Sequence, residues 1–366
     1  HMAFLLGSFY KYGSEKKTSL EMVAPVDFSS GDKEIIQKTA DAIKWYKHYK
    51  AYGVNWSYNP PTNKHMFINM NVDSGKYQSI KKKIAEQIGE ITLLYKCGKR
   101  EKGNATSLSW KSPSWKTNSL NILSRDKKCI VDRMIKINKQ DRVNILPKKL
   151  SKSTVDVLKK DTSNFYVDFE TFNTVCDPLK KDIPHQGFIF MIGITHRHNN
   201  RLIHKTFHVN ELTIMEEFLI MNAFVNYVKL YSKKPKIIYW SAETYLWENA
   251  SNSIFDTLEE ESLKNMICNK WVFNEWIDLS SILRNECVVL RGVYNYKLKD
   301  IAYQLSKFGY VNINTKIKDM NGLTAMVQAF NYYKGRGMSK TFSKIKSYNR
   351  LDCKMLYVIW KFFKTY

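Results

Sequence analysis

Apolar positions along the second half of the chain alternate between strand-like runs and helical spacing. Strand patterns occupy 165–170, 187–198, 201–209 and 236–241. Helical spacing of apolar residues predicts helices over 211–231, 243–252, 297–307, 322–334 and 343–363. Adjacent strands joined by short turns, followed by strands that alternate with helices, are typical of a mixed sheet flanked by helices. We therefore predict an α/β fold for this half.

The first 160 residues are less regular and divide into two parts. Apolar spacing predicts one helix near 33–50 and another over 75–94, separated by a Pro-rich break at 57–64. Residues 146–154, rich in Lys and Ser, are typical of a linker. We predict three domains: an α/β or helical region over 3–90, a basic helical unit with its linker over 91–155, and the α/β domain over 161–366.

The charge of the chain is strongly positive and unevenly distributed. Its 58 Lys and Arg against 34 Asp and Glu give a net charge of +24. Residues 91–160 carry the sharpest excess, with 18 basic and 5 acidic side chains. A positive field concentrates polyanions and speeds their association. We therefore predict DNA or RNA as the partner.

The six cysteines are scattered and form no C-x-x-C pair, which excludes a zinc framework of that kind and a disulfide scaffold. Reduced thiols favour an intracellular compartment, cytoplasm or nucleus. The Lys-, Asn- and Ile-rich composition fits an AT-rich genome, such as a viral one. No apolar run approaches the ~20 residues of a membrane span, so we expect no membrane partner.

The stretch "NFYVDFETFN" at 164–173 places Asp168 and Glu170 two residues apart on a predicted strand. Both side chains therefore point to one face of the sheet. Two carboxylates on one buried face repel each other, and burying them without partners is costly. Either this face is solvated, or a divalent metal ion lies between the two carboxylates.

The last predicted helix carries a second pair of candidate residues. Tyr348 and Asp352 in "SYNRLDC" are four residues apart, one turn along the same face. A tyrosine one turn from a carboxylate could activate a metal-bound water, whereas alone it would be an ordinary half-buried aromatic. Packing of this helix beside the first strand would bring Asp352 to Asp168 and Glu170.

A third acidic position follows the strand at 236–241. Glu243 opens the next predicted helix, near the carboxyl end of that strand, where ligands of open α/β sheets collect. An acidic residue in the first helical turn is also favourable for the helix dipole alone.

The chain carries three motifs in a fixed order: D-x-E, then a later acidic residue, then Y-x-x-x-D. This order resembles the DnaQ-like 3′–5′ exonucleases of the RNase H-like fold, in the subgroup with tyrosine in its last motif. "FYVDFETF", "GFIFMIGIT", "WIDLSSILR", "YKLKDIAYQL" and "SYNRLDC" are also similar to predicted RNase-H-like nucleases fused to RecB-type parts. The resemblance covers about 161–366. It implies an RNase H-like mixed sheet flanked by helices, preceded by a smaller, basic and mainly helical region.

The resemblance also implies a chemistry. Asp168, Glu170 and Asp352 would be metal ligands, and Tyr348 would orient or deprotonate the attacking water. Two Mg²⁺ or Mn²⁺ ions ~3.5–4 Å apart would flank the scissile phosphate. Hard oxygen ligands suit these ions.

The third motif departs from the family, which usually has aspartate there. We expect Glu243 as the fourth ligand, reaching one methylene further. Asp278 in "WIDLSSIL" is the rival, and its alternative role is to cap the helix that follows. Glu248 is a third, more distant candidate.

Residues 87–112 resemble the segment that precedes the nuclease domain in the same predicted proteins, and 3–90 could be a remnant of a RecB-type nuclease, without catalysis of its own. Six side chains are candidates for contact with nucleic acid through their charge or their place near the cleft: Lys96, Lys99, Arg100, Lys102, Lys299 and His185. The alternative for the lysines and the arginine is a solvated surface.

Three functions remain open from the sequence. The first is a metal-dependent 3′–5′ exonuclease on single-stranded or frayed ends. The second is a catalytically silent protein that binds nucleic acid with the same fold, and the third is an endonuclease selective for structure. The RecB-type resemblance suggests a helicase or replication and repair partner without identifying one.

Overall fold

The protein is described by a computed structural model. The described residues are 3–5, 11–12, 15–16, 23–25, 33–58, 62, 66, 68–105, 107–140, 142–160, 163–173, 182–271, 273, 275–314 and 320–366. Within them, no helix is long and apolar enough to cross a membrane.

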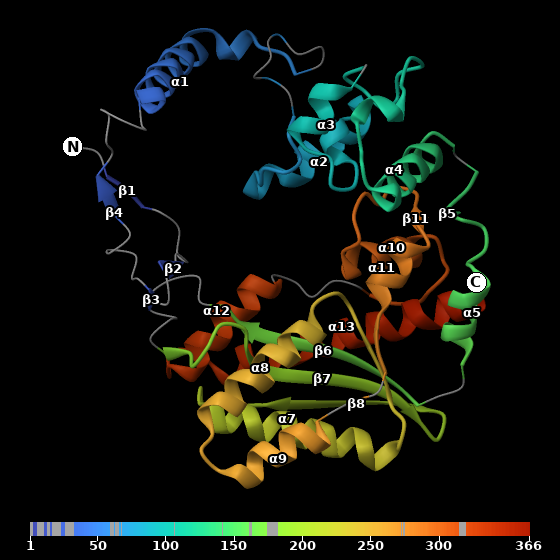
Figure 1. Ribbon diagram of the computed structural model, residues 1–366. Coiled ribbons are helices and arrows are strands. Elements are labelled where there is room, and N and C mark those ends of the chain that lie inside the picture. The colour runs from blue at the N-terminus through green and yellow to red at the C-terminus, as the bar shows by residue number, and fades with distance from the viewer. Residues whose placement is uncertain are drawn as a thin grey trace.

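The centre of the fold is a five-stranded mixed sheet in the order β10-β9-β6-β7-β8 (Figure 1). Its strands are β6 (Asn164–Phe172), β7 (Phe188–His198), β8 (Arg201–His208), β9 (Lys236–Tyr239) and β10 (Glu275–Asp278). The first three strands form an antiparallel meander, and β9 and β10 run parallel to β6. Strand β6 therefore has neighbours on both sides, in the middle of the sheet.

Helices cover both faces of this sheet. The helices of this half are α7 (Ile214–Tyr231), α8 (Glu243–Thr257), α9 (Glu261–Lys270), α10 (Leu279–Asn285), α11 (Leu298–Lys307), α12 (Gly322–Tyr333) and α13 (Ser339–Thr365). Helix α7 packs on β7 and β8, and α13 packs on β6 and β7 (Figure 1). The two packings bury two apolar clusters.

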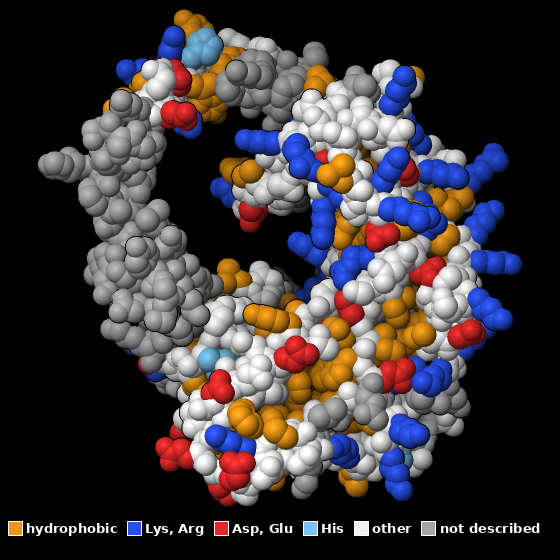
Figure 2. All heavy atoms as spheres, in the orientation of Figure 1, with side chains coloured by type: hydrophobic (Ala, Val, Ile, Leu, Met, Phe, Trp, Pro, Cys, Tyr) orange, Lys and Arg blue, Asp and Glu red, His pale blue; other side chains and the backbone are white. Residues whose placement is uncertain are grey.

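The region before the sheet is mainly helical. Its elements are the short strands β1 (Ala3–Leu5), β2 (Lys11–Tyr12), β3 (Glu15–Lys16), β4 (Val23–Pro25) and β5 (Ile145–Leu146), and the helices α1 (Lys33–Tyr52), α2 (Gln78–Ile88), α3 (Lys99–Asn104), α4 (Arg125–Asn138) and α5 (Lys152–Lys159). Single 3-10 turns lie at Gly53–Asn55, Gly75–Tyr77, Ile91–Leu93 and Thr117–Leu120. Figure 2 shows Lys and Arg side chains crowding the part of the surface that α2, α3 and α4 occupy.

This helical region shares a core with the C-terminal half. Strand β5 pairs with β11 (Val289–Leu290), and Arg133 on α4 donates to the carbonyls of Glu286 and Cys287. One apolar cluster runs from Ala85 and the helices α4 and α5 to residues of α11 and α13. The segment 85–158 is therefore packed onto the sheet domain instead of being tethered beside it.

The predicted fold class, a mixed sheet flanked by helices behind a helical N-terminal region, is confirmed. Sequence patterning missed α9 and the edge strand β10, whereas the helix expected after Asp278 is α10. The three-domain division stays a prediction, and an ion pair between Glu90 and Lys102 crosses its first boundary. Part of the Pro-rich break at 57–64 lies outside the described residues.

Candidate active site

Strand β6 presents Asp168 and Glu170 on the face that α13 covers. Side chains alternate along a strand, so Phe165, Val167 and Phe169 point the other way, into the cluster formed with α7. Asp168 is half-buried, and Glu170 is 7% exposed. The predicted pair is thus on one face, and that face lies against a helix instead of open solvent.

Asn349 on α13 fixes Asp168. Its Nδ2 donates to the backbone carbonyl of Asp168 over 3.0 Å and to Oδ2 of the same residue over 2.8 Å. Gly193 lies opposite Asp168 on β7, where a Cβ would sit 1.7 Å from Asn349 Oδ1. Only glycine lets the amide come this close. Sequence reasoning missed Asn349, although its place between Tyr348 and Asp352 was a usable signal.

Asp352 and Tyr348 lie one turn apart on α13, and each is 7% exposed. Lys299, from the first turn of α11, reaches between them. Its Nζ lies 3.3 Å from Asp352 Oδ2 and 3.5 Å from the centre of the Tyr348 ring. Lys299, predicted as a phosphate contact, is therefore part of the acidic cluster and pairs with one of its carboxylates.

Glu243 and Asp278 follow the neighbouring strands β9 and β10. Glu243 is 6% exposed, and its Oε2 accepts a hydrogen bond from the Ala242 amide over 3.0 Å. Both oxygens of Asp278 are occupied. Oδ1 accepts from the Ser241 amide, and Oδ2 accepts from the Ser281 hydroxyl and pairs with Arg284 over 3.2 Å. Asp278 thus shapes the start of α10, while Glu243 carries fewer bonds.

The carboxylates influence one another strongly. Burial, and then the charges of Asp352 and Glu170, hold the pKa of Asp168 well above its usual range. Burial, and then the charge of Asp352, raises the pKa of Glu170 to about 8. Burial raises the pKa of Glu243 to about 8, and that of Asp352 to about 6 against the opposing effect of Lys299. The structure therefore brings together four acids whose ionised forms are each less favourable than in the free side chain.

Two of these acids have oxygens without a partner. Glu170 Oε1 and Asp352 Oδ1 are buried, and no hydrogen-bond donor from the described part of the chain reaches them. Buried carboxylate oxygens normally find a donor, so each represents an unmet electrostatic demand. A divalent cation would meet it, and the donor set consists of the hard oxygens that Mg²⁺ and Mn²⁺ prefer.

The carboxylates do not form a closed cage. Within the described ranges, no group of three or more His, Cys, Asp or Glu side chains is arranged to hold a metal ion. The reason lies in their present partners. Asp168 is held by Asn349, Asp352 by Lys299 and Glu243 by a backbone amide. The residues present fit a hard divalent cation by chemistry and by their unsatisfied oxygens.

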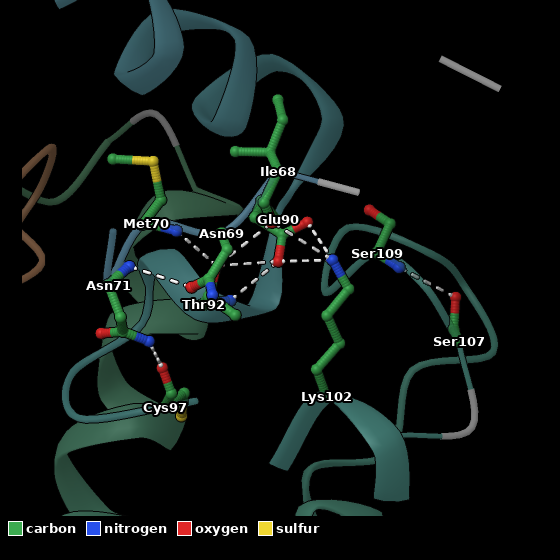
Figure 3. A network of polar contacts seen from close by, with 10 residues as sticks. All are labelled: Ile68, Asn69, Met70, Asn71, Glu90, Thr92, Cys97, Lys102, Ser107 and Ser109. Carbon is green, nitrogen blue, oxygen red and sulfur yellow. Dashed lines mark hydrogen bonds and ion pairs between the residues drawn. The ribbon is translucent and has the colours of Figure 1, made fainter. Parts of the chain in front are cut away.

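The predicted phosphate contacts near α3 divide into two groups. Lys96, Lys99 and Arg100 are exposed. Lys102 is not available, because its Nζ lies 2.7 and 2.9 Å from the two oxygens of buried Glu90 and 3.3 Å from the Ile68 carbonyl (Figure 3). The ammonium of Lys102 therefore neutralises a buried acid inside the helical unit, and its contact with nucleic acid stays a prediction.

His185 is also engaged within the protein. Its Nε2 lies 2.6 Å from Oε2 of Glu217, a fully buried acid whose other oxygen accepts from the Ile189 amide. This arrangement anchors the segment that enters β7. The predicted contact of His185 with nucleic acid stays a prediction.

Comparison with known proteins identifies the family. The sequence profile of the RNase H superfamily matches residues 165–363, more than half of the chain. The chain belongs to the RNase H superfamily. No curated protein and no solved structure matches it significantly. The matched region contains the five strands except the first residue of β6, and almost all of α13. Membership in this superfamily supports a nuclease that hydrolyses nucleic acid.

Proposed function

We propose that the protein is a metal-dependent 3′–5′ exonuclease that hydrolyses single-stranded or frayed ends of DNA or RNA. The observation that carries this proposal is the cluster of Asp168, Glu170, Glu243 and Asp352 beside Tyr348, with two buried carboxylate oxygens left unpaired. Perturbed acids that share a site are typical of catalytic centres. The exonuclease polarity rests on the resemblance of the Y-x-x-x-D motif alone.

In this proposal the four carboxylates hold the cations. Divalent cations would supply the charge that neutralises the scissile phosphate and lowers the pKa of a water. That water would give its proton to bulk solvent and attack the phosphorus, while the 3′ oxygen of the preceding nucleotide leaves. Asp168 and Glu170 come from a central strand, and Asp352 from a long packed helix, so their backbones are rigid. Asn349 positions Asp168 by fixing both its carbonyl and its carboxylate.

Glu243 is the proposed fourth ligand in place of Asp278. Asp278 already uses both oxygens within the protein, and removing it would unsettle the start of α10. Glu243 accepts one amide hydrogen bond, and its negative charge contributes to the raised pKa of Asp168.

In this proposal Tyr348 contacts the attacking water and Lys299 contacts the substrate phosphate. Burial, with the charges of Asp352 and Glu170, raises the pKa of Tyr348, so its phenol stays protonated at neutral pH. A protonated phenol orients the attacking water instead of removing its proton. Lys299 pairs with Asp352 in this arrangement and would pair with a substrate phosphate once cations neutralise that carboxylate.

The experiment compares linear and circular substrates with the purified protein in Mg²⁺ or Mn²⁺. We expect a 5′-labelled single-stranded oligonucleotide to shorten to a ladder, and a circular single strand to remain intact. Asp168→Ala should abolish the ladder. Exposed Asp256 provides the matched control, because it lies on α8 13 residues beyond Glu243, toward the other end of the helix, and Asp256→Asn removes one carboxylate there.

Other results would redirect the proposal. Cleavage of the circle would make the protein an endonuclease. Salt-sensitive binding without cleavage in any divalent ion would identify a silent binding protein. Cleavage that survives Asp168→Ala would refute this site altogether.

A further inference from the structure

A cavity of about 690 Å³ lies at the C-terminal end of α13, away from the acidic cluster. The first residues of β6, the end of β7 and the last turns of α13 enclose it. Lys361 follows Asp352 by nine residues, about 13 Å along the helix axis. Tyr166 precedes Asp168 by two residues, so both side chains lie on the same face of β6. The cavity and the acidic cluster thus share one sheet face and one helix.

The cavity is strongly basic. Arg197, Lys361 and Lys364 line it, and none of the residues that line it is acidic. No carboxylate of the described chain pairs with these three cations, and Arg197 makes only two 3.5 Å contacts to Asn200. The nearby acid Glu275 is already paired with Lys160 and Lys236. Three unpaired cations around one concave space form an anion site of charge +3.

Aromatic rings form the rest of the wall. Tyr357 is half-buried and packs edge-on against Tyr166, with ring centres 5.4 Å apart. Trp360 lines the same space and is 1% exposed, and its indole Nε1 donates to no described group. An aromatic face beside cations, with a buried donor left over, matches a base joined to a phosphate.

We propose that this cavity binds one nucleotide unit, with its phosphate on Arg197, Lys361 and Lys364 and its base against Tyr357. That the unit belongs to the substrate strand rests on the proposed function. The site then holds the strand at a distance from the acidic cluster. Binding here would add affinity for strands long enough to reach from one site to the other.

The test measures binding in EDTA, where cleavage is impossible. The probe is a 5′-fluorescein single-stranded 12-mer, and anisotropy gives Kd at several salt concentrations. Arg197→Ala/Lys361→Ala should raise Kd about tenfold and reduce the salt slope by about one to two. The control Lys205→Ala/Lys307→Ala removes two exposed charges elsewhere and should change Kd less than about twofold.

Two further measurements separate the sources of the nucleotide. AMP titrated into the same protein tests a free nucleotide, and competition that weakens in the Arg197→Ala/Lys361→Ala variant would extend the ligand to free nucleotides. Photo-cross-linking of a 5-bromouracil oligonucleotide should label the peptide that contains Tyr357. Equal loss of affinity in both double variants, or no loss in either, would overturn the site.

These outcomes are independent of catalysis. A protein that never cleaves can still show the binding difference, which would leave the cavity proposal standing and the nuclease proposal refuted. Cleavage together with unchanged binding in the Arg197→Ala/Lys361→Ala variant would refute the cavity proposal and leave the nuclease proposal standing. Circular dichroism and thermal unfolding of each variant would show that the fold is retained.

Discussion

Glu101 in the basic helical unit and Glu170 in the sheet are equally buried, each 7% exposed, and yet their pKa values move in opposite directions. Burial alone would raise the pKa of Glu101, but Lys127 at 2.7 Å and the Gly98 amide hold it down to about 2. Burial and the charge of Asp352 raise that of Glu170 to about 8.

Much of this difference in pKa comes from the partners of the two carboxylates. Glu101 was buried together with the cation and the amide that its charge needs, so its ionised form stabilises the fold. Glu170 was buried beside other acids, with one oxygen unpaired, so its ionised form destabilises the fold. An acid that costs stability without compensation inside the protein indicates a ligand from outside it.

The largest effect should follow from removing the charge of Glu170. Glu170→Gln keeps the shape of the side chain and removes a proposed metal ligand, so we expect the rate of cleavage to fall roughly 10³-fold or more. The measurement is kcat on the labelled single-stranded oligonucleotide in saturating Mn²⁺. The same variant should unfold at a higher temperature than the parent in EDTA at pH 8, because it removes like-charge repulsion.

Asp256→Asn on α8 is the control for both the rate and the unfolding temperature. Its side chain is exposed, and neither the rate nor the unfolding temperature should change. A Glu170→Gln protein with normal cleavage would remove Glu170 from the site.

The second effect concerns Glu101 in the helical unit, where removing the charge should lower stability and leave the rate of cleavage unchanged. Glu101→Gln leaves Lys127 without its partner, and breaking such a pair costs about 2–4 kcal/mol. The free energy of unfolding, from urea titration, should fall by that amount, while kcat per folded molecule stays unchanged. Glu101→Gln/Lys127→Met should recover part of the loss, since it removes both charges. A selective loss of kcat would show that the two regions are not separable.

Sequence patterns predicted the sheet well because its signal is local. The core strands β6 and β7 are long and apolar, the helix α7 is apolar over most of its length, and α11 and α13 have clear apolar stripes. Strand β10 is four residues long, and only two of its side chains, Trp276 and Ile277, are apolar. Its place in the sheet comes from pairing with β9, a contact that no local pattern reports.

The sequence predicted which acidic residues share the candidate site, but not which side chains pair with them. The spacing of Asp168 and Glu170 placed them on one face, and Y-x-x-x-D did the same for Tyr348 and Asp352. Which cation each acid meets depends on contacts between residues far apart in the chain. Lys102 and Lys299 looked alike in sequence, yet one neutralises Glu90 and the other meets Asp352.

A third effect concerns the contact that brings α13 onto β7. In Gly193→Ala the new methyl group would collide with Asn349 Oδ1, and the fully buried Asn349 side chain would have to shift. We expect a loss of about 1–3 kcal/mol in unfolding free energy and a lower rate, because Asn349 would release Asp168.

Gly193→Ala/Asn349→Ala tests this reason. It should restore most of the stability, because the colliding side chain is gone, but not the rate. Restoration of both would mean that Asn349 does not position Asp168.

The smallest effect is the pH dependence of stability, which should differ in pH range between the sheet site and the helical unit. The folded pKa of Glu170 and Glu243 lies near 8, above the ordinary value of 4.5, so the folded protein binds more protons than the unfolded chain between these values. Stability without metal must therefore fall as pH rises from about 5 to 8. Glu101, with its folded pKa near 2, loses its contribution to stability only as pH falls below about 4.5.

In EDTA we expect the midpoint of thermal unfolding to drop by about 2 °C or more between pH 5.5 and 8. Mg²⁺ should flatten this slope, since cations stabilise the ionised acids, and Glu170→Gln should flatten it without Mg²⁺. A slope of equal size in the variant and the parent would assign the pH dependence to other groups and break the contrast between the two glutamates.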